Sequence, residues 1–145
     1  MTAPFRRLSL PILAILLTVF TGCGDNRPDR VPVSGRVTID GTPLTYGHVR
    51  LVPDNARPSG GRLDAQGRFT LTCYDGQDGA VPGHHRIEVS AGEMQGSKMH
   101  WHAPKKYNSL ATSGLDTTIG GPIDDLEIKL TWDGGKPFDE EVEQE

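Results

Sequence analysis

Apolar and polar residues alternate along most of the chain beyond residue 30, and an alternation with a period of two predicts β-strands. Six segments show this pattern, with apolar side chains on one face and polar side chains on the other. They are residues 31–39, 47–53, 69–73, 85–91, 115–119 and 126–132. Such strands are stable only when a second sheet covers the apolar face, so the pattern predicts an all-β, antiparallel sandwich. A closed barrel would give the same alternation.

Turn residues separate these segments. The chain contains 18 Gly and 11 Pro, which predicts many turns and little helix. Residues 92–114 follow neither the strand nor the helix period, so a long connection is expected there, with one helical turn near residues 104–109. Asp64-Ala65-Gln66-Gly67 lacks the further acids that a calcium loop needs, and it predicts a plain turn.

The first 22 residues have the features of an export signal. Arg6 and Arg7 precede an apolar run, residues 8–20, whose 13 residues fall short of the ~20 that a membrane-spanning helix needs. Phe20-Thr21-Gly22-Cys23 then resembles the bacterial lipobox, in which the chain is cut before a cysteine that receives lipid. The sequence therefore predicts a signal peptide at residues 1–22 and a lipid on Cys23, which anchors the mature chain in a membrane.

The mature chain divides by composition into three parts. Residues 23–30 are polar and contain proline, which predicts a flexible tether, and residues 31–132 contain the six predicted strands. Residues 133–145 hold a cluster of acids and predict a disordered, solvated tail. Removing residues 1–22 takes away two arginines and no acid from a chain of net charge −4, so the mature chain carries −6. This acidic balance argues against nucleic acid as a partner.

The chain has only two cysteines. Once Cys23 carries lipid, Cys73 has no partner within the chain, so the fold must hold without a disulfide. Cys73 shares its strand parity with Phe69 and Leu71, which predicts a buried and unreactive thiol.

Several motifs share their order and spacing with a known family. They are Val33-Ser34-Gly35-Arg36-Val37, Asp40-Gly41-Thr42-Pro43-Leu44, Gly47-His48-Val49-Arg50-Leu51, Asp64-Ala65-Gln66-Gly67-Arg68-Phe69, and Val81-Pro82-Gly83 followed by Arg86-Ile87-Glu88-Val89. Residues 31 to about 130 resemble the carboxypeptidase regulatory-like, transthyretin-like domain. With the lipobox and Pro104-Lys105-Lys106-Tyr107-Asn108-Ser109, the whole resembles the small lipoproteins of planctomycete bacteria. The resemblance implies a prealbumin-like (Ig-like) sandwich of about seven strands with no established catalytic role. His85 stands where that family tends to have Tyr.

Two groups of residues in the long connection suggest ligand chemistry. In an extended segment, His100 and His102 would share a face and could hold Cu²⁺ or Zn²⁺, with a third ligand from His48, His84 or His85. Trp101 and Tyr107, if exposed, could stack on sugar rings, although burial against the sandwich is equally natural. Catalytic motifs such as Gly-x-Ser-x-Gly, His-Glu-x-x-His and Cys-x-x-Cys do not occur.

These features together predict a noncatalytic structural or binding module of the bacterial cell envelope, without a cofactor. Its partners are expected to be the membrane, through the lipid on Cys23, and an envelope protein or glycan. Gly24, where an acid would favour retention at the inner membrane, favours the outer membrane facing the periplasm. The alternatives are a Cu²⁺- or Zn²⁺-binding envelope protein that uses His100 and His102, a glycan-binding module, and a hydrolase.

Overall fold

The computed structural model describes residues 26–142, which fold almost entirely into strands and loops. The predicted signal peptide and Cys23 lie outside these residues. The described part contains eleven strands and one 3₁₀ helix, η1 (Lys105–Asn108), which lies where a helical turn is expected. No helix within residues 26–142 is long and apolar enough to cross a membrane. The all-β prediction is confirmed.

One layer of the sandwich is built around strand β1 (Val33–Ile39). On one side β1 pairs with β10 (Ile123–Leu130), and on the other with β2 (Thr42–Pro43) and β5 (Arg68–Thr70). The β1–β10 pair is parallel, whereas all the other strand pairs of the described residues are antiparallel. The parallel pair departs from the antiparallel sandwich that the alternation predicts. It arises because β10 reaches β1 from the other layer and no hairpin joins the two strands.

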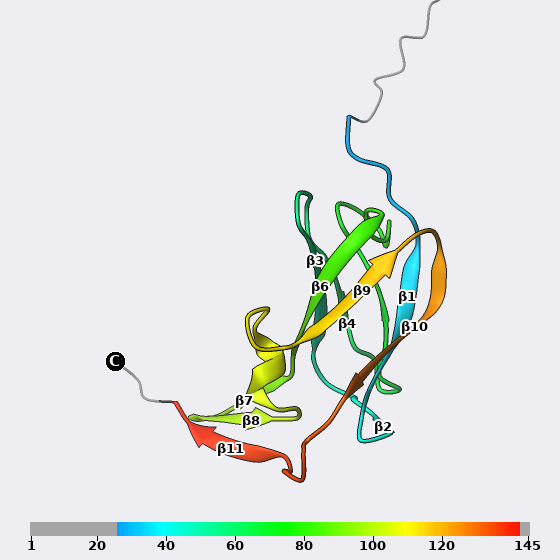
Figure 1. Cartoon of the computed structure of the whole chain (residues 1–145). Helices are drawn as coiled ribbons and strands as arrows, with labels where there is room; N and C mark the ends of the chain where they lie inside the picture. The colour runs from blue at the N-terminus through cyan, green and yellow to red at the C-terminus, as the bar shows by residue number, and fades with distance from the viewer. Residues whose placement is uncertain (1–25, 143–145) are drawn as a thin grey trace, which may run out of the picture.

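The second layer is a four-stranded antiparallel sheet (Figure 1). Its order is β4 (Ser59–Arg62), β3 (His48–Pro53), β6 (Gly83–Ser90) and β9 (Leu115–Ile119). The layers are also joined directly, because the N–H groups of Gly60 and Thr72 each donate to the other residue's carbonyl oxygen, at 3.0 and 2.9 Å. The sandwich is therefore closed along the side where β4 meets the end of β5.

The core lies between these two layers, on the faces that the alternation assigns to it. Buried side chains from both sheets include Val33, Val37, Ile39, Val49, Leu51, Phe69, Leu71, Ile87, Val89, Ile119, Ile128 and Leu130. His85 is also fully buried, and its Nε2 lies 2.8 Å from the carbonyl oxygen of Val81. Each of the six predicted segments contains a strand (β1, β3, β5, β6, β9 and β10), but β5 ends at Thr70 and is shorter than the predicted residues 69–73.

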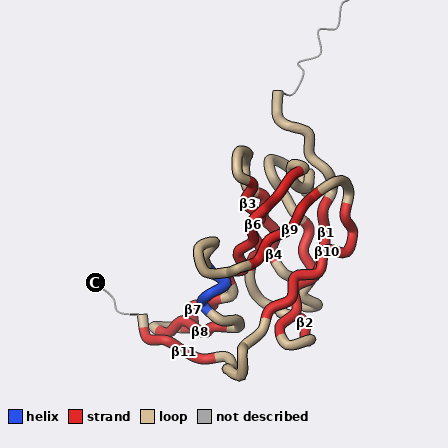
Figure 2. The backbone as a smooth tube through the Cα atoms, viewed as in Figure 1, coloured by secondary structure: helices blue, strands red, loops and turns tan. Residues whose placement is uncertain are grey.

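A third, small sheet lies at the end of the sandwich opposite the N-terminal segment (Figure 2). It consists of β7 (Gly92–Gln95), β8 (Lys98–Trp101) and β11 (Phe138–Glu141), with β8 in the middle. The connection at residues 92–114 thus contains a hairpin, and part of the expected disordered tail at residues 133–145 forms a strand.

Two lysine ion pairs and one histidine–carboxylate contact hold the acidic strand β11 to its neighbours. Asp139 pairs with His100 at 2.6 Å, Glu140 with Lys105 at 2.8 Å, and Glu141 with Lys98 at 3.1 Å. The side chains of β11 are thus matched by basic groups on β8 and η1, and not by a hydrophobic face. Considered alone, a run of acidic residues predicts a segment exposed to solvent. For this reason the sequence pattern did not predict strand β11.

Gly35 permits the close approach of β1 to β10, and its replacement is the sharpest test of this packing. A Cβ atom on Gly35 would overlap the carbonyl oxygen of Leu126, whereas one on Gly121 would meet no atom within 4 Å. We expect Gly35→Ala to lower the free energy of unfolding by about 1–3 kcal/mol, as overpacking does. The control Gly121→Ala should change it by no more than about 0.5 kcal/mol. Urea denaturation measures both, and equal effects would contradict the assigned register.

Candidate functional site

A polar groove of about 690 Å³ crosses the outer face of the sandwich where the two layers join. Its walls come from β1, β5, β4, the start of β3 and the start of β10. The lining residues are Ser34, Gly35, Arg36, His48, Gly60, Gly61, Arg62, Asp64, Arg68, Phe69, Thr70, Thr72, Gln77, Asp124 and Asp125. Most of these are the outward-facing residues of their strands, so the groove belongs to the solvated face and not to the core.

Glycines keep the floor of this groove open. A Cβ atom on Gly60 would lie 2.6 Å from Cε1 of the His48 ring, and one on Gly61 would lie 2.6 Å from the carbonyl oxygen of Thr70. Any side chain at these positions would displace β5 or the His48 ring. The same glycines made residues 59–62 look like a loop in the sequence, although they form strand β4.

Three arginines from three strands line the groove. Arg36 of β1 and Arg68 of β5 are register partners, and Arg62 of β4 is the register partner of His48. Arg68 pairs with Asp64, with Nε 3.1 Å from Oδ2. Arg36 and Arg62 are exposed and form no ion pair with any residue from 26 to 142. Two guanidinium groups are therefore available to a ligand here.

These charges affect their neighbours. Burial, followed by the positive charges of Arg50 and Arg62, lowers the pKa of His48 below its ordinary value. Hydrogen bonds from the backbone N–H groups of Arg68 and Gln66 hold the pKa of Asp64 low. The two bonds also confirm that Asp64-Ala65-Gln66-Gly67 is a plain turn.

The side of the groove that β10 forms is acidic. Asp124 and Asp125 both line it, at a point where β10 has one residue more than β1 between consecutive register pairs. Such a β-bulge changes the direction of the side chains around it. The Ser34 hydroxyl donates to the carbonyl oxygen of Asp124 at 3.1 Å and fixes this bulge. Neither aspartate carboxylate forms an ion pair with any other described residue.

Hydroxyl groups line the middle strands of the groove. Ser34 and Thr70 are register partners on β1 and β5, and Thr72 follows two residues after Thr70 and pairs with Gly60 of β4. Within residues 26–142, no hydroxyl or thiol forms a hydrogen bond with a histidine, the pairing that activates a nucleophile. The geometry suits noncovalent binding.

The structure brings His100 and His102 together, as the metal hypothesis requires, with ring centroids 4.6 Å apart. Each ring already contacts a carboxylate: His100 Nδ1 lies 2.6 Å from Asp139, and His102 Nε2 lies 2.9 Å from Glu93. The described part of the chain holds no group of three or more His, Cys, Asp or Glu arranged for a metal ion. The proposed third ligands, His48, His84 and His85, lie on β3 and β6.

Trp101 and Tyr107 are both buried, at 8% and 4% exposure. The indole Nε1 of Trp101 donates to Glu140 at 3.1 Å, and the Tyr107 hydroxyl accepts from the N–H of Thr131 at 3.1 Å. Neither ring offers an open face to a sugar. The hypothesis that these two aromatic residues stack on a glycan is therefore wrong, and packing against the sandwich accounts for both.

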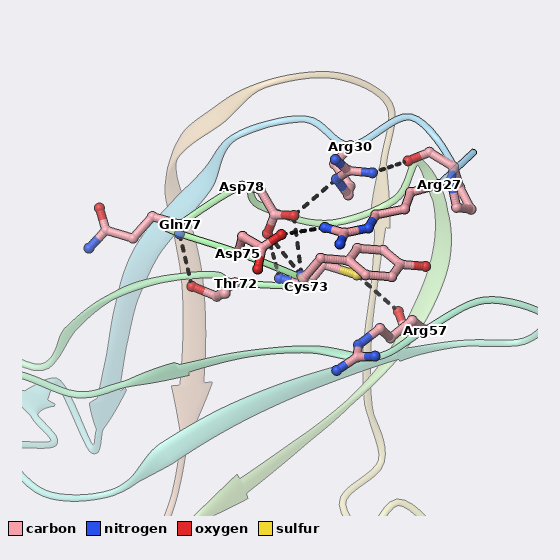
Figure 3. Close-up of polar contacts among 10 residues, drawn as sticks. Arg27, Arg30, Arg57, Thr72, Cys73, Asp75, Gln77 and Asp78 are labelled. Atoms are coloured by element: carbon pink, nitrogen blue, oxygen red, sulfur yellow. Dashed lines mark hydrogen bonds and ion pairs between the residues drawn. The ribbon is translucent and has the colours of Figure 1, made fainter. Parts of the chain in front are cut away.

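A second cluster fixes the segment that enters the fold (Figure 3). The Tyr74 ring has the guanidinium carbons of Arg27, Arg30 and Arg57 at 4.9, 5.0 and 5.0 Å from its centroid. Arg27 also pairs with Asp75, and Arg30 pairs with Asp78 at 3.0 Å. The predicted flexible tether, residues 23–30, is thus docked on the sandwich from Arg27 onward, because cation–π and ionic contacts hold its two arginines.

Asp78 organises the loop beneath this cluster. Its carboxylate accepts hydrogen bonds from the backbone N–H groups of Cys73 at 2.7 Å and Tyr74 at 3.2 Å. Burial acts to raise the pKa of Asp78, but the backbone hydrogen bonds and the Arg30 charge outweigh it and hold the pKa below its ordinary value. The Cys73 thiol is buried, as predicted, and burial together with the Asp78 charge raises its pKa.

The Asp78 contacts predict an acid-dependent contribution to stability. Because the folded-state pKa is lowered, the contribution is present above the unfolded value of about 4 and is lost as the pH falls through the folded value. We expect Asp78→Asn to lower the free energy of unfolding at pH 7 by about 1–3 kcal/mol and to flatten its decline below about pH 4. Asp75→Asn, at an exposed ion pair, should cost less than about 1 kcal/mol. Urea denaturation from neutral to acidic pH tests this, and an unchanged acid profile in Asp78→Asn would contradict it.

Comparison with known proteins finds no relative of this chain. Neither a family model, nor a curated protein, nor a solved structure matches the chain. The resemblance to the carboxypeptidase regulatory-like domain stays a prediction. The fold of residues 26–142 is a mainly antiparallel all-β sandwich, and the groove is known from its geometry alone.

Proposed function

We propose that this protein is a lipid-anchored, noncatalytic binding module of the bacterial cell envelope, and that the polar groove is its binding site. The observation that carries the proposal is the pair Arg36 and Arg62, which line the groove without an acidic partner among the described residues. An exposed charge that has no partner within the protein gains most binding energy from a ligand that supplies the opposite charge. The glycine floor leaves the space in which such a ligand fits.

The anchoring part of the proposal rests on the amino-terminal sequence. The basic residues, the short apolar run and the cysteine at position 23 together fit lipoprotein export to the envelope and, with Gly24, the outer membrane facing the periplasm. Only three residues lie between Cys23 and Arg27, which is docked beside Tyr74, so these two residues can be at most about 14 Å apart. The anchored module would stand close to the membrane with the Tyr74 cluster nearest to it.

The noncatalytic part rests on the chemistry of the groove. Its histidine, His48, lies over Gly60 and forms no hydrogen bond with a hydroxyl of the described residues, and the groove hydroxyls contact backbone groups or stand alone. A hydrolase would need a base within hydrogen-bond reach of a nucleophile, and no such pair occurs among residues 26–142.

Photo-crosslinking in living cells tests the binding site, with a photoreactive residue in place of Thr70, which is exposed in the groove. Thr118, which is exposed on β9 and is not part of the groove lining, provides the matched control. We expect a discrete crosslinked envelope component from position 70 only, and we expect Arg36→Gln/Arg62→Gln to reduce it severalfold. Equal labelling from both positions, or labelling that ignores the arginines, would refute the groove as the site.

Metabolic labelling with palmitate tests the anchor. The chain should incorporate label and fractionate with membranes, and Cys23→Ser should lose both properties because it removes the acceptor thiol. Retention of Met1 with an unmodified Cys23 in the mature protein, seen by mass spectrometry, would contradict the anchored form.

A further inference from the structure

We infer that a small hollow beside the polar groove binds an acidic sugar, a uronate whose carboxylate pairs with Arg62. This inference rests on the proposed function and names the ligand class of that site. The hollow has a volume of about 230 Å³. Its lining residues are Tyr46, Gly47, His48, Arg62, Ser90 and Gly92. His48 and Arg62 also line the groove, so the two cavities are neighbours and one ligand can occupy both.

Strand register places three polar side chains of the hollow in one row. Ser90 of β6, His48 of β3 and Arg62 of β4 are register partners on three neighbouring strands, and all three are exposed. Tyr46, two residues before His48, also lines the hollow. The two glycines of the lining add no side chain, so four polar side chains surround one small space.

None of these four side chains has a polar partner within the described part of the chain. The side chains of Tyr46, His48, Arg62 and Ser90 form no hydrogen bond or ion pair with any residue from 26 to 142. The Tyr46 ring is held in place by the ring of His102, with centroids 4.9 Å apart. Two hydroxyls, an imidazole and a guanidinium are therefore all available to a ligand in the hollow.

Arg62 is the one residue of this lining with a permanent charge. Acids on the adjoining segments already contact other groups: Asp64 contacts Arg68, Glu88 contacts Arg50, and Glu93 contacts His102. The hollow thus carries one uncompensated positive charge. A carboxylate matches it, because a guanidinium binds a carboxylate through two parallel hydrogen bonds. A phosphate monoester carries about −1.5 to −2 at pH 7 and would leave negative charge in excess.

The acids of β10 are too distant to neutralise Arg62. The pairing of β4 with β5 places Arg62 opposite Thr70, which is the register partner of Ser34. Ser34 lies beside the bulge that holds Asp124 and Asp125. Three strand spacings of ~4.8 Å therefore separate the backbone at Arg62 from these acids, or about 14 Å. This exceeds the screening length of about 8 Å at physiological ionic strength.

The neutral groups of the hollow suit a sugar ring. The hydroxyls of Tyr46 and Ser90 can both donate and accept, and a neutral His48 ring offers one donor and one acceptor. Sugar hydroxyls have the same dual capacity. A ring that carries one carboxylate and several hydroxyls can therefore satisfy all four polar side chains of the hollow.

The groove suits the sugars that would follow this ring in a glycan. The carboxylates of Asp124 and Asp125 accept hydrogen bonds from hydroxyl groups, and the groove also presents three hydroxyl side chains of its own. Phe69, the large apolar residue of the groove lining, is buried at 3% exposure, so the groove offers no apolar pocket to a peptide side chain. These contacts favour a glycan over a peptide as the carrier of the carboxylate.

Titration of the full chain in detergent micelles with methyl glucuronide, followed by amide shifts in NMR spectra, tests the inference. Methyl glucoside is the matched neutral probe, because it differs only in having a hydroxymethyl group in place of the carboxylate. We expect the glucuronide to shift the signals of His48 and Ser90 at millimolar concentration. The glucoside should bind at least about tenfold more weakly, because it lacks the charge-assisted pair with Arg62. N-acetylalanine, a carboxylate without a sugar, and inorganic phosphate should also bind more weakly than the glucuronide.

Variants assign the carboxylate to its partner. In Arg62→Gln, the glucuronide and the glucoside should bind equally, because the carboxylate has lost its partner. Arg62 is exposed and forms no ion pair with the described residues, so this variant should fold as the unaltered protein does. Arg86, an exposed arginine of β6 that lines neither cavity, provides the matched control. Arg86→Gln should keep the preference for the glucuronide.

The inference fails if the glucuronide does not bind, if the glucoside binds as tightly, or if N-acetylalanine or phosphate binds more tightly than the glucuronide. If position 70 still crosslinks an envelope component in an arginine-dependent way, the proposed function survives and only the acidic sugar fails. If the crosslink is also absent, both fail.

Discussion

The close approach of backbones at Gly35 and Gly61, with the His48 ring over Gly60, is the constraint on which the rest of this structure depends. At Gly60 and Gly61 the two layers come near enough for β4 to meet the chain that follows β5, and at Gly35 the strands β1 and β10 come together without a side chain between them. Each contact excludes a Cβ atom. The same absence of side chains leaves the outer face hollow, so the feature that closes the sandwich also creates the groove.

Much of the fold follows from the sequence, because burial of alternate residues is a local signal. The six strands of the two main layers, the inward position of Cys73 and the turn at Asp64 all agree with the alternation and with turn chemistry. The parallel pairing of β1 with β10 was not predictable in this way. Whether two strands pair in parallel or antiparallel depends on how the chain crosses between the layers. No single segment of the sequence determines that crossing.

The parts that the sequence did not predict are held by contacts between distant charges. Strand β11 depends on Lys98, His100 and Lys105, and the docked tether depends on Tyr74 and two aspartates more than 40 residues away. A run of acids or a short polar segment gives no local sign of such partners. The groove was missed for a related reason: Arg36, Arg62 and Asp124 come from three strands, and only the register shows that they line one surface.

The docked tether has a consequence for how the proposed anchored module would search for ligand. A long flexible linker would let the domain sample a large volume above the bilayer, which lowers the local concentration of its binding site. A linker with only three residues between Cys23 and Arg27 would keep the domain within a thin layer. In that layer the effective concentration of anything else attached to the same surface is high. A groove of modest intrinsic affinity would then be occupied chiefly by molecules that share its membrane, and free molecules in the surrounding fluid would compete poorly.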